Sequence, residues 1–255
     1  MAAMSAPSAA ILVAAVALLA GAVASVAGFG IGSLLTPLLA LWFPTGVAVA
    51  FVALPHALAT LIRWLGLRRD VSWTVFRQFG LASAVGGLTG AALQSRLASP
   101  VLSGVLGALL LVAGLGELTR RAPPLPRSAV GGWLGGILSG FFGGLVGNQG
   151  GIRSAALLRF GLTPREIVAT ATAPALLVDL ARVPVYLATR GRDLGPTLPL
   201  LLPACAGAVA GTLIGVPILR RIPAGAFHRL LGILLVVLAL FLFRAALWPA
   251  PRRPA

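Results

Sequence analysis

The sequence predicts an all-α integral membrane protein made of two similar halves, each containing a helix that is broken by glycines. Of the 255 residues, 58% are hydrophobic and only 10% are charged, whereas soluble domains carry about 25% charged residues. The mean hydropathy is +1.01. The apolar runs are long and lack the alternation of β-strands, which excludes an outer-membrane β-barrel. We therefore expect about 8–10 membrane segments in two pseudo-symmetric repeats.

The apolar runs and their breaks divide each half into five segments. These are 9–27, 32–43, 46–66, 76–97 and 100–118 in the first half, and 129–146, 151–160, 165–188, 195–219 and 223–246 in the second. A span of about 30 Å needs about 20 residues at 1.5 Å each. The segments 32–43 and 151–160 are too short, so each forms either a kinked span with its predecessor or a hairpin turning back within the membrane. Kinked spans give eight helices in parallel halves, and hairpins give ten in inverted halves.

A polar, proline-rich linker at 119–128 separates the halves, because its prolines cannot continue a helix. It divides a first membrane repeat, 1–118, from a second, 129–248, and a disordered tail follows at 249–255. The repeat is visible in residues that recur at a spacing of 119, namely Gly28 and Gly147, Pro55 and Pro174, and Arg63 and Arg182.

The net charge of +15 comes from 20 basic residues, all arginine, against five acids. A basic balance can indicate nucleic-acid binding, but most of these arginines lie at the ends of apolar runs, as in loops that face anionic lipid and the cytoplasm. We therefore expect the lipid bilayer, and no nucleic acid, as a partner. Because residues 1–27 contain no basic residue, we expect them to be a retained first membrane segment and not a signal peptide.

Motifs for metal binding or catalysis are absent from the sequence. It has one cysteine, Cys205, and two histidines, His56 and His228, which are far apart along the chain. No Cys/His cluster can hold a metal, and no nucleophile elbow, phosphate loop or zincin pair occurs. We expect no metal, no cofactor and no enzyme activity.

A glycine cluster interrupts an apolar run in each half: Gly28-Phe29-Gly30-Ile31-Gly32 in the first, Gly147-Asn148-Gln149-Gly150-Gly151 in the second. Each glycine costs a helix about 1 kcal/mol, and unwound backbone at membrane depth is tolerated only where it lines a cavity. A helix restarting after the break directs unpaired N–H groups inward, which suits an anion. Asn148 and Gln149 add amide donors and Arg153 adds a charge. The alternative is that these glycines serve only close helix packing.

Arg63 and Arg182 lie near the end of the third segment of their halves. An arginine inside a span costs at least about 2.5 kcal/mol, so it normally faces a partner or a wet cavity. The alternatives are that Arg63 extends to the lipid headgroups and that Arg182 forms a structural pair with Asp179, one turn earlier. Asp179 and His56, which can titrate near neutral pH, are candidates for proton coupling. His56 can instead be hydrogen-bonded to a neighbouring helix.

These features resemble the TauE/SafE-type sulfite exporters, the TSUP family of predicted bacterial anion permeases. The resemblance rests on two glycine-rich breaks, Gly28 to Pro37 and Gly147 to Ile152, the second continuing into Phe160 to Thr172. It covers nearly the whole chain, including the two halves and the central linker. The family pattern favours G-x-G-G-G, from which Ile31 and Gln149 depart.

The resemblance implies a multi-pass secondary transporter of the bacterial inner membrane that carries sulfite, an organosulfonate or another small sulfur oxyanion, driven by a proton or sodium gradient. The expected anion site lies where the two breaks meet, and one half rocks against the other. A passive anion channel and a membrane-embedded enzyme are the alternatives. The expected binding residues are Gly28, Phe29, Gly30, Gly32, Gly147, Asn148, Gln149, Gly150, Gly151, Arg153, Arg63 and Arg182.

Overall fold

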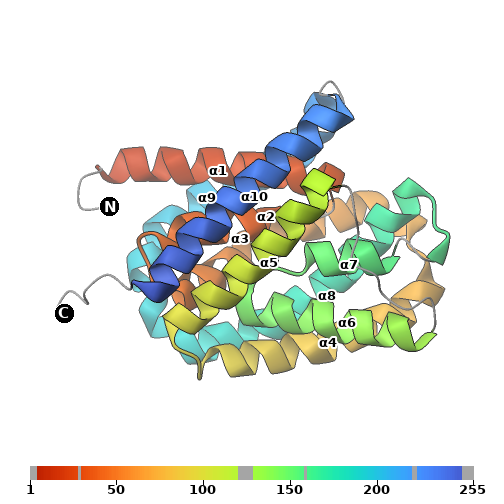
Figure 1. The fold of residues 1–255 in the computed structure, drawn as a ribbon, viewed down its shortest axis with the longest axis horizontal. Helices are drawn as coiled ribbons and strands as arrows, with labels where there is room; N and C mark the ends of the chain where they lie inside the picture. Colours follow the sequence, from red (N-terminus) through yellow and green to blue (C-terminus); the bar gives the residue numbers. More distant parts are fainter. Residues whose placement is uncertain (1–4, 28–29, 120–128, 158–159, 220–222, 249–255) are drawn as a thin grey trace.

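The computed structural model describes residues 5–27, 30–119, 129–157, 160–219 and 223–248, which fold into a bundle of helices (Figure 1). Its α-helices are α1 (Ala6–Ala27), α2 (Ile31–Ala40), α3 (Thr45–Leu67), α4 (Trp73–Gln94), α5 (Ser99–Thr119), α6 (Ala129–Val146), α7 (Gly150–Leu157), α8 (Pro164–Arg190), α9 (Leu198–Leu219) and α10 (Ala224–Leu247). Two 3₁₀ helices, η1 (Arg68–Asp70) and η3 (Gly191–Thr197), follow α3 and α8. The described residues contain no strand. The all-α prediction is confirmed, and each predicted segment matches one helix.

Several helices are long and apolar enough to cross a membrane. Among the described residues, five stretches meet this condition: Ala6–Ser25, Thr45–Asp70, Ser99–Thr119, Arg165–Gly215 and Gly225–Leu247. The fourth stretch covers most of both α8 and α9. Large apolar side chains also cover the outside of the bundle, as at Leu202, which is 78% exposed, and Leu213, which is 63% exposed. Hydrocarbon, and not water, is the environment that suits such a surface.

Glycines allow two pairs of helices to touch at their backbones. Three glycines four residues apart on α9 face the backbone of α1, and these are Gly207, Gly211 and Gly215. The same spacing recurs where α6 packs on α4, at Gly136, Gly140 and Gly144. Both pairs run parallel, because the contact positions advance together along the two helices. This is the small-residue packing that stabilises helix pairs in membranes.

The short helices α2 and α7 turn back along the helix that precedes them. The Ser139 hydroxyl of α6 donates to the carbonyl oxygen of Gln149 at 3.1 Å, although ten residues of continuous helix would span about 15 Å. Gly30, before α2, packs in the same way on the backbone of Ala20 in α1. Of the two alternatives for the short segments, the structure therefore shows hairpins and not kinked spans.

The direction of the remaining contacts agrees with ten alternating segments. In α5 and α10 the contact positions run in opposite directions, since Gly107 faces Ala239 and Gly114 faces Gly232. Figure 1 shows these two helices side by side along one face of the bundle. The inverted relation of the halves and the bounds 1–118 and 129–248 stay predictions. Most of the predicted linker (120–128) and the whole tail (249–255) lie outside the described residues.

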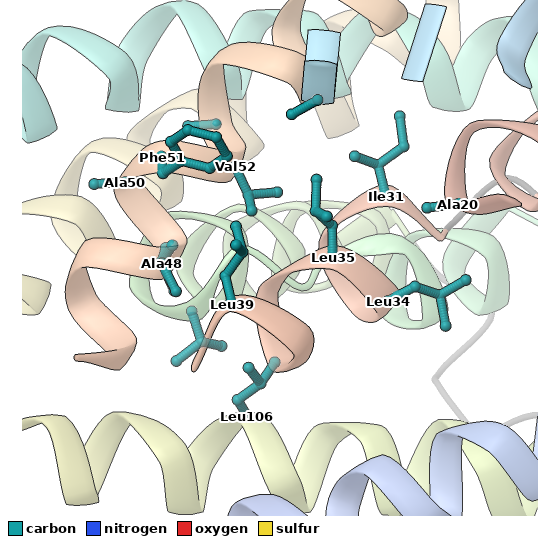
Figure 2. Packing of buried hydrophobic residues seen from close by; sticks show 14 of the residues in the cluster. Ala20, Ile31, Leu34, Leu35, Leu39, Ala48, Ala50, Phe51, Val52 and Leu106 are labelled. Atoms are coloured by element: carbon teal, nitrogen blue, oxygen red, sulfur yellow. The ribbon is translucent and has the colours of Figure 1, made fainter. Parts of the chain in front are cut away.

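An apolar core fixes α2 against its neighbours (Figure 2). Ile31, Leu35 and Leu39 recur every four residues and so share one face of α2. All three are fully buried, as is Phe51 of α3 on the neighbouring helix. Leu106 approaches the same cluster from α5. This packing holds the start of α2 in place at the first glycine break.

The sequence also defines where α8 begins. The Thr163 hydroxyl accepts a hydrogen bond from the Glu166 backbone N–H at 3.4 Å, and the Glu166 carboxylate accepts one from the Thr163 N–H at 2.8 Å. This reciprocal capping box satisfies two backbone donors that a helix start leaves free. Pro164 occupies the first helical position, where its missing N–H is no loss. The helix that follows carries Asp179 and Arg182 into the bundle.

Candidate functional site

The two glycine breaks meet inside the bundle. α6 ends at Val146, α7 begins at Gly150, and Gly147 between them has a φ of +74°, a conformation that glycine adopts without strain. The space in front of Gly32 is filled by the carbonyl group of Gly147, so that a Cβ on Gly32 would overlap the carbonyl oxygen. The predicted contact between the breaks is therefore present.

A cavity of about 20 Å³ lies at this meeting point. By this measure one water molecule needs roughly 10–15 Å³, so the space admits at least one water-sized group. The lining residues are Ala24, Gly30, Gly32, Ser33, His56, Arg63, Gly147, Asn148, Gln149, Gly150, Arg153 and Ala175. Both α2 and α7 begin here, and the first turn of a helix leaves backbone N–H groups without an intrahelical partner.

Four of the predicted binding residues are not among the described residues that line the cavity. Gly151 and Arg182 do not line the cavity. Arg182 and Asp179 are buried in α8, with 1% and 0% of their surfaces exposed. Gly28 and Phe29 lie outside the described residues, so the structure does not place them.

Asn148 and Gln149 have their oxygen atoms engaged and their nitrogen atoms free. The Asn148 Oδ1 accepts a hydrogen bond from the Ser33 hydroxyl at 3.3 Å, and the Gln149 Oε1 accepts one from Arg153 Nη2. Their amide nitrogens, Nδ2 and Nε2, are buried without a hydrogen-bond partner among the described residues. An unpartnered buried donor costs about 1–3 kcal/mol, so both amides are suited to bind a hydrogen-bond acceptor in the cavity.

Arg63 and Arg153 bring positive charge to the same place. Arg63 Nη1 donates to the carbonyl of Ala24 at 2.7 Å, and Arg153 Nη1 donates to that of Ala171 at 3.2 Å. The Nε atoms of both arginines are buried and unpartnered in the described part of the chain. All five acids of the sequence lie in the described ranges, and none pairs with either arginine. Neither arginine therefore forms an ion pair within the described residues, and a buried cation without such a partner costs several kcal/mol.

Arg182 forms a structural ion pair behind the cavity. Its Nη2 lies 2.7 Å and its Nε 3.0 Å from Asp179 Oδ1, and its Nη1 donates to the Gly143 carbonyl at 2.5 Å. The bond from Arg63 to Ala24 is the equivalent contact, because donor and acceptor each lie 119 residues earlier. The paired alternative therefore applies to Arg182. Arg63 bonds within the bundle and does not extend to the headgroups.

One protein family has a model that matches this chain. The model of the sulfite exporter TauE/SafE family matches residues 13–242, nearly the whole chain. The chain belongs to this family. No curated protein and no solved structure matches it. The TauE/SafE member described here is therefore a multi-pass membrane transporter and not an enzyme, and the resemblance inferred from its glycine breaks is confirmed.

Three lining residues of this TauE/SafE transporter were not predicted: Ala24, Ser33 and Ala175. Ser33 follows the first break directly, so it could have been found as the first polar residue after the glycines. Ala175 lies 119 residues after His56, and the repeat could have indicated it. Ala24 contributes a carbonyl oxygen to Arg63, and backbone contacts of this kind leave no mark in the sequence.

Proposed function

We propose that this transporter moves a small anion, sulfite or an organosulfonate, across the bacterial inner membrane, and that the anion binds in the cavity between the two glycine breaks. The observation that carries the proposal is the group of four buried, unpartnered donors at this cavity: Arg63 Nε, Asn148 Nδ2, Gln149 Nε2 and Arg153 Nε. An oxyanion has several acceptor oxygens and negative charge, so it would satisfy these donors and offset the two unpaired arginines.

The architecture supports alternating access as the transport mechanism. The donors come from both halves: Arg63 lies on α3, Asn148 and Gln149 lie in the break before α7, and Arg153 lies in the first turn of α7. An anion between them therefore contacts both halves at once, so a rocking motion of one half against the other would expose it to either side. A passive channel would need a continuous path and no such motion.

The substitution Gln149→Glu tests the site. It keeps the shape of the side chain but replaces a donor with a carboxylate. A like charge at about 4 Å costs about 4 kcal/mol at an effective dielectric of about 20, so we expect anion affinity to fall by about a thousandfold. Gln78→Glu makes the same chemical change at a half-buried position of α4 outside the cavity, and we expect it to leave affinity unchanged.

Affinity is measured on purified protein with sulfite, sulfate and methanesulfonate, and flux is measured in proteoliposomes. A bound anion at 100 times its Kd stabilises the fold by about 2.7 kcal/mol, which a thermal-unfolding assay detects. Equal anion affinity in the Gln149→Glu and wild-type proteins would refute the proposed site. Flux that rises linearly with anion concentration and ignores ion gradients would favour the channel.

A further inference from the structure

His56 is a titratable group at the cavity for which anion binding alone gives no role. It follows Pro55 in α3 and lines the cavity directly. Its Nδ1 lies 2.7 Å from Asp179 Oδ2 and 3.4 Å from the Thr60 hydroxyl. Because a carboxylate only accepts hydrogen bonds, Nδ1 carries the proton of the neutral ring. The nitrogen left to take up a second proton is Nε2, which has no hydrogen-bond partner among the described residues.

Asp179 orients this histidine and is not suited to carry a proton itself. One of its oxygens binds Arg182 and the other binds His56. Its side chain is 0% exposed, whereas that of His56 is 12% exposed. Solvent therefore reaches the imidazole and not the carboxylate. An ionised Asp179 that bonds to Nδ1–H fixes the ring, as carboxylates do for other functional histidines.

The charges around His56 depend on whether an anion is present. The positive charges that act on His56 are Arg182 on α8 and Arg63 on α3, and Arg153 lines the same cavity. Among the described residues, the negative charge at this place comes from Asp179, which bonds to both His56 and Arg182. The helices α1, α2 and α6 contain no charged residue. In the empty cavity these cations oppose the attraction of Asp179 for a protonated imidazole. An anion next to the ring offsets the cations and itself attracts the imidazolium, so it favours protonation.

We propose that His56 Nε2 is the site of the coupling proton, so that one proton enters the cavity together with each anion. This inference rests on the proposed anion site. The proton is taken from water, binds Nε2 while Nδ1–H stays on Asp179, and returns to water on the other side when the anion leaves. By linkage, anion affinity rises as the pH falls, because the protonated form of His56 is the one that the anion stabilises. The transporter is then an anion–proton symporter.

The number of protons taken up on binding tests this directly. Titration calorimetry is performed with sulfate and methanesulfonate, which do not themselves titrate between about pH 6 and 8, in buffers of different ionisation enthalpy. The slope of binding enthalpy against buffer enthalpy gives the protons bound per anion. We expect a slope near one for the wild type at about pH 7.5. For His56→Gln, whose amide still donates but does not titrate, we expect a slope near zero with anion affinity retained within about tenfold.

His228→Gln is the matched control, because His228 is the only other histidine and bonds to Glu117 away from the cavity. We expect it to keep the wild-type slope. Two results would overturn the role of His56 while leaving the anion site intact. One is anion binding without proton uptake in the wild type, and the other is a His56→Gln protein whose slope of binding enthalpy against buffer enthalpy equals that of the wild type. Failure of both anions to bind would overturn the coupling and the site together.

Discussion

Replacing Gly32 with alanine tests whether the contact between the two breaks builds the anion site. Gly32 is the second residue of α2, and the carbonyl of Gly147 fills the space where its Cβ would lie. The nearest further atoms are also backbone, the carbonyl carbon of Gly147 at 3.1 Å and its Cα at 4.0 Å. A flexible side chain could rotate away from the new methyl group, but a backbone carbonyl cannot. The two breaks must therefore move apart by roughly 1 Å.

The size of the effect follows from what that movement disrupts. The Ser33 hydroxyl, one residue further along, lies 3.3 Å from Asn148 Oδ1 and would pass beyond hydrogen-bond reach. The Asn148 amide would then lose its orientation toward the cavity. A hydrogen bond to a charged group contributes about 1.5–3 kcal/mol, so losing one between Asn148 and the anion weakens binding by about 10- to 150-fold. Overpacking adds about 1–3 kcal/mol of destabilisation.

The assay is anion affinity by calorimetry together with thermal unfolding of the same samples. The control is Gly104→Ala in α5, where the nearest atom to a new Cβ is the Ala246 methyl at 3.9 Å, an ordinary contact. It should bind the anion as the wild type does and gain up to about 1 kcal/mol from helix propensity. If Gly32→Ala binds the anion as tightly as Gly104→Ala, the breaks do not need their close contact and the reasoning is wrong.

Two further predictions separate backbone strain and buried charge from anion binding. Gly147 and Gly161 have φ values of +74° and +68°, so alanine at either position should lower the free energy of unfolding by about 1–2 kcal/mol. Only Gly147→Ala, at the cavity, should also weaken anion affinity. Equal anion affinities of the Gly147→Ala and Gly161→Ala proteins would contradict this. Arg182→Met leaves the buried Asp179 without its cation, so we expect the free energy of unfolding to fall by about 3–5 kcal/mol. Denaturant unfolding in detergent measures this change. An Arg182→Met protein as stable as the wild type would contradict the structural role of the pair.

The helices were predictable because the membrane imposes simple rules on the sequence. Long apolar runs marked the spans, and prolines and glycine clusters marked their ends, so each α-helix of the described residues was found. The choice between kinked spans and hairpins was not predictable, because both give the same hydropathy along the chain. It depends on contacts between distant residues, such as the bond from Ser139 to the carbonyl of Gln149.

Residues of the candidate site could be predicted where they are unusual inside an apolar run, and could not be predicted where they are ordinary there. Gly147, Asn148, Gln149 and Arg153 are costly inside an apolar run, and the structure places all four at the cavity. Arg182 breaks the same rule for another reason, since its partner Asp179 lies one turn away on the same helix. Sequence alone could not decide between a charge that binds substrate and a charge that is paired within the fold, because the other bond of Arg182 goes to a backbone carbonyl.

The many glycines of the chain have two distinct uses, and the structure separates them. Gly140 on α6 faces the backbone of Ser83 within a continuous helix, so its role is close packing and an alanine there affects only stability. Gly32 and Gly147 lie where helices begin and end, and their close approach brings the starts of α2 and α7 to one cavity. Packing alone would not require the unpaired amides of Asn148 and Gln149 beside them, since buried donors without partners reduce stability. Their retention in an apolar bundle is explained if an anion satisfies them during transport.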